Sequence, residues 1–454
     1  MSTIAAISTA PGVGGIGIIR ISGKEAFSIL EKIFIPKNNS SIEGYKIKYG
    51  KIVDPETKSI VDEVLVSYFV APKSYTTENM CEINSHGGIA IIKEILELCL
   101  KNGADLAEPG EFTKRAFLNG RIDLCESEAV IDMINAKTKK EASAAVNQLE
   151  GRLSNKIQAI RKQTISLLSD IEATIDYPEY DVPEVTEKHI LQELQKILEE
   201  LEKLEKSFEN GKILKEGIKT VIIGKPNVGK SSLLNAILQE DRAIVTNIER
   251  TTRDIIEETV VVEGIPLKII DTAGIRDTED EIEQIGIEKS KKTAKEADLV
   301  IAILDGEKQL SKEDKQILEI IKDKKSILVL NKTDLPDFNA SLLGKIQIAS
   351  PIVKISAKEG TGIEELYQEI SKLFQLQQIN LDSDCLVTNV RHKNLIHKAK
   401  EQCKKTMQVV CDKMPIDIVA IEITNILENL GQITGDNATE DVIRDIFSKF
   451  CLGK

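Results

Sequence analysis

The residues with the clearest chemistry form the run Gly224–Ser231, which fits the phosphate-binding pattern G-x-x-x-x-G-K-[ST] at every fixed position. The run follows the apolar segment Val221–Ile223 and leads into a helix-like segment, so it joins a buried strand to a helix. In such a loop, backbone N–H groups and a helix N-terminus bind phosphate. We expect Lys230 to contact the β- and γ-phosphates and the Ser231 hydroxyl to ligate Mg²⁺. The run therefore predicts a nucleoside triphosphate site.

Three further signatures follow in the order that a guanine-nucleotide switch needs. Thr251–Asp254 is predicted to be switch I, in which Thr252 ligates Mg²⁺ and senses the γ-phosphate. Asp271–Gly274 ends an apolar strand and is predicted to be switch II. Asn331–Asp334 follows another apolar strand, and its Asp and Asn suit the N1–H and amine of guanine. Ser356–Lys358 resembles the loop that closes over the base.

Each signature alone has an ordinary structural explanation, since an Asp at a strand end is often a helix cap and Asn331–Asp334 could be a polar loop. Four signatures in the correct order favour a guanine-nucleotide site. One departure concerns Ile275, which follows Asp271–Gly274 where Ras carries a glutamine that orients water. The carboxylates of residues 276–283 could orient water instead, or could form a solvated acidic loop.

Length and composition limit the class of protein. The chain has 454 residues, enough for roughly three domains of about 150 residues each, and 41% apolar content is ordinary for a globular protein. No apolar run approaches the ~20 residues of a membrane span, and the first residues lack a secretory or transit signal, so we expect a cytoplasmic protein. Seven scattered cysteines without a C-x-x-C pair suggest neither a disulfide framework nor a zinc site, and most should be core residues. A net charge of −13 argues against broad non-specific nucleic-acid binding.

The fold class predicted is multidomain α+β and α/β. Residues 1–118 alternate strand-like and helix-like runs and should form an α+β domain. Residues 119–215 and 379–454 are predicted to be the two parts of a discontinuous helical domain, with a long amphipathic helix through Ile190–Leu204. Prolines in residues 176–183 should end the preceding helix. Residues 216–378 should be an inserted Ras-like P-loop GTPase domain with a doubly wound sheet.

Together with the nucleotide motifs, three runs resemble the MnmE (TrmE) family of tRNA-modification GTPases over the whole length. They are Pro11–Gly23, Pro109–Gly120 and the end Phe450–Lys454, whose Cys-x-Gly-Lys is the most specific mark. The resemblance implies a GTPase that works with the FAD-dependent partner MnmG (GidA) in a heterotetramer or larger complex, FAD lying only in the partner. The pair would add an aminomethyl or carboxymethylaminomethyl group to C5 of the wobble uridine of certain tRNAs.

The resemblance also implies a folate site and a homodimer in the amino-terminal domain. The one-carbon donor would be 5-formyl- or 5,10-methylene-tetrahydrofolate, and the matching folate-binding positions are Arg20, Glu82, Arg121 and Lys454. Arg can pair bidentately with the glutamate tail of a folate, and Glu can accept from its amino-pyrimidine edge. Arg121 stands where some members carry Lys, so individual contacts there can differ. From the residues alone, each of these side chains could equally belong to a surface ion pair.

Family GTPases use K⁺ and pair their G domains across the nucleotide, and the matching K⁺ ligands here are Asn227, Thr246, Ile248 and Thr251. Such a cation would supply the charge that an arginine finger gives elsewhere. Glu283 matches the catalytic glutamate, and Lys230 is the second catalytic candidate. Arg250 replaces the usual Gly before the switch I motif, so the potassium loop can differ in shape or charge. The predicted GTP-binding residues are Asn227, Val228, Gly229, Lys230, Ser231, Ser232, Thr246, Thr251, Thr252, Asp271, Thr272, Ala273, Gly274, Asn331, Lys332, Asp334, Ser356 and Ala357.

Several residues keep two interpretations. Cys451 could be a nucleophile toward C6 of a uridine or a buried or flexible terminal thiol, and its neighbours favour the latter. The basic run Arg391–Lys405 could bind tRNA phosphates or be a solvated helix face. His86 is interpreted as structural. The alternative functions are a ribosome-associated switch of the Era or Der type, which should carry a KH-type domain or a second G domain, and a folate-binding dimer with a vestigial G domain.

Overall fold

The computed structural model describes residues 1–10, 12–38, 43–176, 186–240, 258–270, 293–336, 338, 346, 348–378 and 385–454. They form two compact units. One unit contains residues 1–134, 147–199 and 395–454, and the other contains residues 135–146 and 200–394. Each unit is therefore built from segments that lie far apart in the sequence. None of the helices in these described ranges combines the length and apolarity that crossing a membrane requires.

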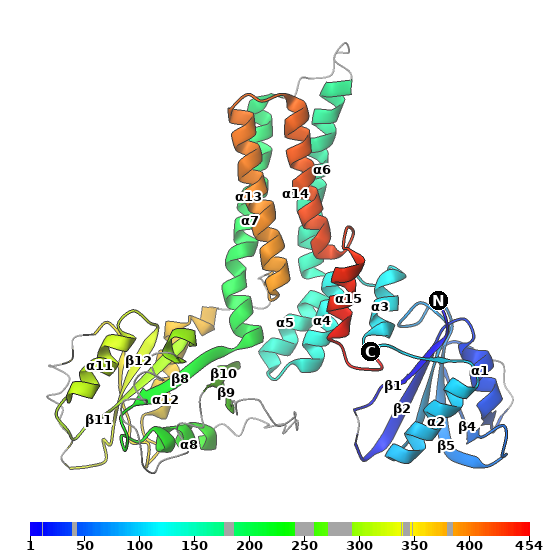
Figure 1. The fold of residues 1–454 in the computed structure, drawn as a ribbon, viewed down its shortest axis with the longest axis horizontal. Coiled ribbons are helices and arrows are strands. Elements are labelled where there is room, and N and C mark those ends of the chain that lie inside the picture. Colours follow the sequence, from blue (N-terminus) through cyan, green and yellow to red (C-terminus); the bar gives the residue numbers. More distant parts are fainter. Residues whose placement is uncertain are drawn as a thin grey trace. The chain divides into compact units, whose positions relative to one another are not determined.

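The amino-terminal residues form a seven-stranded sheet in the order β3-β4-β5-β6-β2-β1-β7, antiparallel except for the parallel pair β1 and β7. The helices α1 and α2 lie against this sheet (Figure 1). They supply Ile29, Leu30 and Ile95 to a buried core shared with Ile21 and Ile83 of the sheet. The elements confirm the predicted α+β character. They are β1 (Ile4–Ile7), β2 (Gly14–Ser22), α1 (Ala26–Ile33), β3 (Phe34–Pro36), β4 (Lys46–Val53), β5 (Ile60–Phe69), β6 (Met80–Gly87), α2 (Ile89–Lys101) and β7 (Asp105–Leu106).

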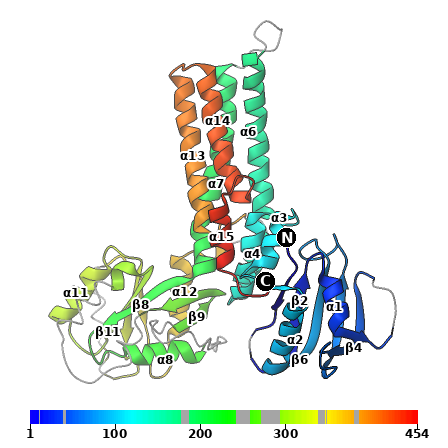
Figure 2. The ribbon, with the colours of Figure 1, turned by 45° about the vertical axis from the view of Figure 1, so that its right-hand side comes forward.

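Helices dominate the chain after residue 110 and again after residue 385. They are α3 (Glu111–Leu118), α4 (Leu124–Asn135), α5 (Lys139–Leu149), α6 (Arg152–Asp176), α7 (Glu187–Glu216), α13 (Val390–Cys411), α14 (Ile416–Thr434) and α15 (Glu440–Ser448). In both views α6, α7, α13 and α14 run side by side (Figures 1 and 2), and the Cys403 thiol on α13 donates to the Leu194 carbonyl on α7. The predicted long amphipathic helix is α7, which buries Ile190 and Leu201. Of the seven cysteines, Cys81, Cys99, Cys125 and Cys403 are buried, as predicted for most of them.

The central part of the chain forms a six-stranded sheet in the order β13-β12-β11-β8-β10-β9. All neighbouring strands are parallel except β9 and β10. β11 and β12 are buried along their whole length, as expected for apolar strands covered on both faces. The elements are β8 (Ile218–Gly224), α8 (Lys230–Glu240), β9 (Glu258–Val262), β10 (Ile265–Ile269), β11 (Leu299–Asp305), α11 (Lys312–Ile321), β12 (Ser326–Asn331), β13 (Ile352–Lys354), α12 (Ile363–Leu373) and the 3₁₀ helix η2 (Leu376–Gln378).

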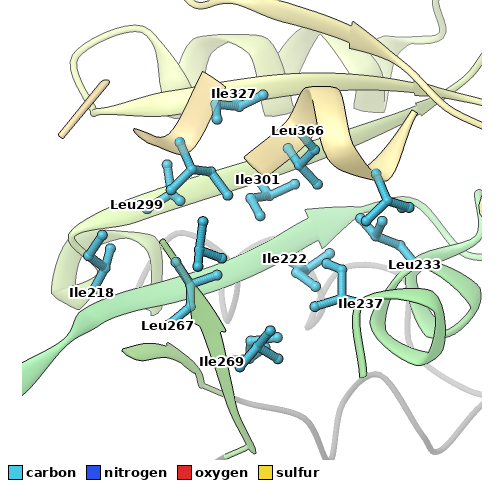
Figure 3. Close-up of a cluster of buried hydrophobic side chains, with 14 of the residues drawn as sticks. Ile218, Ile222, Leu233, Ile237, Leu267, Ile269, Leu299, Ile301, Ile327 and Leu366 are labelled. Atoms are coloured by element: carbon cyan, nitrogen blue, oxygen red, sulfur yellow. The ribbon is translucent and has the colours of Figure 1, made fainter. Parts of the chain in front are cut away.

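Figure 3 shows the core on one face of this sheet, where Ile222, Ile301 and Ile327 meet Leu233 of α8 and Leu366 of α12. A second core covers the other face. It includes Val300 of β11, Leu328 of β12 and Ile317 of α11. The sheet is therefore covered on both faces, which confirms the predicted Ras-like α/β domain inserted between helical segments of the chain.

This unit also takes residues from outside its sheet and covering helices. Leu214 at the end of α7 and Ala144 of α5 are part of its core. The Val387 N–H donates to Ser207 Oγ on α7, at 3.1 Å. Gly211 packs so closely against the Val387 carbonyl that a Cβ there would lie 2.1 Å from its oxygen. The end of α7 is thus part of the α/β unit.

Candidate functional site

The phosphate loop joins β8 to α8, as the sequence predicts. Asn227 has φ 62° and Gly229 has φ 98°, so the chain turns through two left-handed positions before the helix starts. The Lys230 ammonium lies over the loop and donates to the carbonyls of Gly224, at 2.9 Å, and Lys225, at 2.7 Å. Burial lowers the pKa of Lys230, because desolvation disfavours its charged form. An anionic phosphate would restore the stabilisation that this ammonium loses by burial.

Asn331 connects the phosphate loop to the loop predicted to close over the base. Its Nδ2 donates to the Val228 carbonyl at 2.8 Å, and its Oδ1 accepts from the Ala357 N–H at 3.0 Å. A Cβ on Gly229 would lie 2.1 Å from the same Nδ2. Glycine at position 229 is therefore required both by its positive φ and by the close approach of Asn331.

The acceptor predicted to recognise guanine, Asp334, is held by Ser356. The Ser356 hydroxyl donates to Asp334 Oδ1 at 2.6 Å, and this hydrogen bond is the main reason that the pKa of Asp334 is lowered. The Glu359 N–H in turn donates to Ser356 Oγ, at 3.2 Å. The carboxylate is thus oriented and kept ionised, as an acceptor for two guanine N–H donors must be.

Lys332 has a partner that the sequence did not predict. Its Nζ lies 2.8 Å from Asp305 Oδ2 at the end of β11. Burial alone would raise the pKa of Asp305, but the hydrogen bond from Lys332, the Glu307 N–H and nearby lysine charges lower it overall. Asp305 ends a buried apolar strand, which is the same pattern that identified Asp271. That pattern could therefore have identified Asp305 as a residue of the site.

Many predicted residues lie outside the described part of the chain. They are Thr246, Ile248, Arg250, Thr251, Thr252, Asp271, Thr272, Ala273, Gly274, Ile275 and Glu283. Both predicted switches and most predicted K⁺ ligands belong to this group. Of the predicted metal ligands, Asn227 and Ser231 are described, and both lie in or beside the phosphate loop. Their side-chain oxygens suit hard cations such as Mg²⁺ and K⁺.

The four predicted folate residues lie together at the amino-terminal sheet. Arg20 and Glu82 are paired across β2 and β6, and Arg20 Nη2 lies 2.8 Å from Glu82 Oε1. The guanidinium carbons of Arg20 and Arg121 lie 5.5 Å and 4.7 Å from the centre of the Tyr75 ring. Burial, and then the charge of Arg20, lower the pKa of Lys454, while Glu82 acts in the opposite direction. Arg20 thus contacts both the Glu82 carboxylate and the Tyr75 ring, Arg121 shares that ring, and Lys454 lies within electrostatic reach of Arg20 and Glu82.

The last residues of the chain are bound at this cluster. The Gly453 carbonyl accepts from Ser8 Oγ at 3.1 Å and from Arg20 Nη1 at 3.4 Å. The Lys454 carbonyl accepts from the Phe112 N–H at 3.2 Å. Gly453 has φ 83°, and a Cβ there would lie 2.2 Å from the Ile7 carbonyl oxygen. This docking places Lys454 at the site, and nothing in the sequence identified Tyr75 as the ring that joins the two arginines.

Cys451 and His86 are also located. Cys451 is exposed, which excludes the buried alternative for its thiol and leaves a flexible terminal thiol or a nucleophile. The backbone of the tail is held by the bond from the Gly110 N–H to the Cys451 carbonyl. His86 Nδ1 lies 2.7 Å from the nearly buried Asp62 carboxylate, which agrees with a structural role.

The basic run Arg391–Lys405 forms the first part of α13. Lys405 lies 2.8 Å from Glu422 and Lys404 lies 3.2 Å from Glu401. Lys393 lies over the Phe208 ring, 4.5 Å from its centre. Lys404 and Lys405 keep much of their side-chain surface exposed, and exposed ion pairs are weak, so a tRNA surface and a solvated helix face remain the two interpretations of this run.

Comparison with known proteins identifies the family. The family model described as "MnmE helical domain" matches residues 124–451, and that described as "GTP-binding protein TrmE N-terminus" matches residues 3–121. The protein named tRNA modification GTPase MnmE from Acetivibrio thermocellus is 53% identical over 454 residues, covering 100% of this chain and 99% of the relative. Proteins with the same name from Clostridioides difficile and Lactiplantibacillus plantarum are 50% and 48% identical, covering 100% of this chain and 99% and 98% of theirs. The matched models and these full-length relatives show that the chain belongs to the MnmE (TrmE) family.

Proposed function

We propose that this protein is a GTP hydrolase that takes part in tRNA modification. The observation that carries the GTP assignment is the bridge from Asn331 to Val228 and Ala357, which joins a phosphate loop to a loop where Ser356 orients Asp334. Such an arrangement suits a nucleotide with phosphates at one end and a guanine N1–H and amine at the other. The part in tRNA modification is supported by the names of relatives that are 48–53% identical over the whole chain. A switch of the Era or Der type has no comparable support.

The proposed modification adds an aminomethyl or carboxymethylaminomethyl group to C5 of the wobble uridine, with the flavoprotein MnmG as partner and a tetrahydrofolate as carbon donor. The cluster of Arg20, Glu82, Arg121 and Lys454 supports the folate part of this proposal. Its cations suit the glutamate tail of a folate, and Glu82 can accept from an amino-pyrimidine edge. Arg20 binds Glu82 through Oε1, so the second carboxylate oxygen of Glu82 could accept from a folate while the ion pair is kept. We further propose a cytoplasmic homodimer through the amino-terminal domain.

The residues of the nucleotide site have separate tasks in hydrolysis. Lys230 would leave the carbonyls of Gly224 and Lys225 for the phosphates, where its charge stabilises the transition state. Ser231, with Thr252, would hold Mg²⁺, and Asn227, with Thr246, Ile248 and Thr251, would hold K⁺. These ions supply positive charge beside the phosphates when bound. Glu283 is proposed to orient the attacking water, because Ile275 has no polar group to do so.

Hydrolysis of GTP by the full chain, measured in KCl and in NaCl at equal ionic strength, tests the enzyme. Faster release of phosphate in KCl is expected; equal rates would remove K⁺ from the mechanism, and no hydrolysis in either salt would favour a vestigial nucleotide site. Mass spectrometry of tRNA wobble nucleosides from a deletion strain tests the pathway. Unchanged modification in that strain would contradict the tRNA assignment while leaving the GTPase intact.

A further inference from the structure

A second lysine of the phosphate loop, Lys225, is anchored on helix α11. Its Nζ lies 2.7 Å from Asp314 Oδ2 and 3.0 Å from Ser311 Oγ. The Asp314 side chain is only 5% exposed and that of Lys225 is 20% exposed. Asp314 Oδ1 is buried and has no hydrogen-bond partner within the described ranges. Because a buried carboxylate without a counter-charge is strongly unfavourable, Asp314 depends on the charge of Lys225.

Asp314 is itself held firmly, because it belongs to the cap of α11. The Asp314 N–H donates to Ser311 Oγ at 3.3 Å, and the Ser311 N–H donates back to Asp314 Oδ2 at 2.9 Å. This reciprocal capping box fixes the start of the helix. The carboxylate that receives Lys225 is therefore attached to a rigid element.

The backbone of Lys225 contacts the catalytic lysine. Its carbonyl accepts from Lys230 Nζ at 2.7 Å, beside the Gly224 carbonyl at 2.9 Å. The ion pair of the Lys225 side chain with Asp314 thus anchors the loop backbone next to Lys230. No other side chain in the described part of the loop is shown to make an ion pair with α11.

We propose that the Lys225–Asp314 ion pair is a positioning device, which anchors the backbone of the phosphate loop so that its N–H groups keep the geometry that binds nucleotide. The inference rests on the proposed GTP site. Lys225 does not act on the phosphates, since its ammonium is engaged by Asp314 and Ser311. Asp314 contributes by preorganising the phosphate loop. A loop that is already ordered loses less conformational entropy when nucleotide binds, so its nucleotide affinity is higher.

The expected signature is a uniform loss of nucleotide affinity. The loop N–H groups are expected to bind the β-phosphate, which GDP and GTP share, so breaking the pair should weaken the binding of both nucleotides by the same factor, roughly tenfold. The KM for GTP should rise by a similar factor while kcat changes by less than about twofold, because the lost term is common to the ground and transition states.

The experiment uses the full chain with the variants Lys225→Met, Asp314→Asn, their double and Lys225→Arg. Met keeps the apolar stem of Lys225, and Asn keeps an oxygen that can accept in the cap, so each change removes mainly the charge. Lys315→Met, an exposed lysine on the same helix, is the matched control. Fluorescent GDP and a non-hydrolysable GTP analogue are titrated into each protein, and steady-state GTP hydrolysis gives KM and kcat.

The proposal predicts that the double variant binds no more weakly than the weaker single variant, that Lys225→Arg stays within about threefold of the parent, and that Lys315→Met equals the parent. Unchanged affinity in Lys225→Met or Asp314→Asn, or losses that simply add in the double, would overturn it. So would equal losses in Lys225→Arg and Lys225→Met. A parent protein that binds neither nucleotide would instead overturn the proposed function, and the inference with it.

Discussion

Asn331 and Val228 are joined by a hydrogen bond of 2.8 Å, which ties the end of β12 to the middle of the phosphate loop. The same side chain accepts from Ala357, so one amide contacts two loops that are remote in sequence. An Asn has both the donor and the acceptor that this task needs, and an Asp would lose the donor. The phosphate side and the base side of the site therefore cannot shift independently.

Replacing Gly229 by Ala should abolish this coupling. The new Cβ would lie 2.1 Å from Asn331 Nδ2 at a φ of 98°, so the loop must move. We expect nucleotide affinity to fall at least about 100-fold, measured by titration with fluorescent GDP. Gly103→Ala is the control. Gly103 has φ 115°, and no atom lies within 4 Å of the added Cβ, so this substitution causes backbone strain without a steric clash. Similar nucleotide affinity in both variants would contradict the role of the Asn331 contact.

Replacing Ser356 by Ala should make guanine binding more sensitive to acid. The Ser356 hydroxyl is the main cause of the lowered pKa of Asp334, whose ordinary value is 3.8. Without it the pKa returns upward, so protonation of Asp334, and loss of the acceptor, begins at a higher pH in Ser356→Ala than in the parent. Titration of GDP affinity against falling pH checks this. Ser356→Thr keeps a hydroxyl and should follow the parent; coincident profiles of parent and Ser356→Ala would refute the prediction.

Replacing Glu82 by Gln should change the ionisation of Lys454. Burial and Arg20 already lower the pKa of Lys454, and Glu82 opposes them, so removal of the Glu82 charge should lower that pKa further. The ammonium would then lose its proton at a lower pH, which ¹⁵N NMR of the lysine side chain can measure. Affinity for 5-formyl-tetrahydrofolate, measured by calorimetry, should fall roughly tenfold. Glu63→Gln, an exposed carboxylate on neighbouring β5, should change neither quantity.

Replacing Gly453 by Ala should release the end of the chain. The added Cβ would lie 2.2 Å from the Ile7 carbonyl oxygen, so the tail cannot keep its bonds to Ser8 and Phe112. Folate binding should be lost or fall at least about tenfold, whereas GDP affinity should stay unchanged. Leu452→Ala alters an exposed neighbour and should bind folate like the parent. Retained folate binding in Gly453→Ala would show that tail docking is not required.

The sequence predicted the elements well, because their signals are local. The apolar runs of β8, β10 and β12 and the periodic stripe of α7 are each sufficient to identify an element. The phosphate loop was predictable for the same reason, since its residues are contiguous and the glycine at 229 meets a backbone requirement.

The partners that link distant elements were not predictable in the same way. Asp305 pairs with Lys332 across 27 positions and Asp314 with Lys225 across 89, and no periodicity relates them. Tyr75 lies between two arginines only because the fold brings β2 and the segment after α3 together. Likewise, the sequence left the Cys451 thiol either buried or flexible, and its exposure could not be foreseen because the tail docks through its backbone and not through that side chain.

The contacts of α7 with the α/β unit have a practical consequence for dissecting the protein. A fragment of residues 216–378 would omit Leu214 from the core, Gly211 and Ser207 from their packing against Val387, and Ala144 of α5. Extending it to residues 200–394 restores all of these except Ala144, which no contiguous excision of that length can include. A fragment that keeps the whole α/β unit would therefore need residues 135–146 as well as residues 200–394.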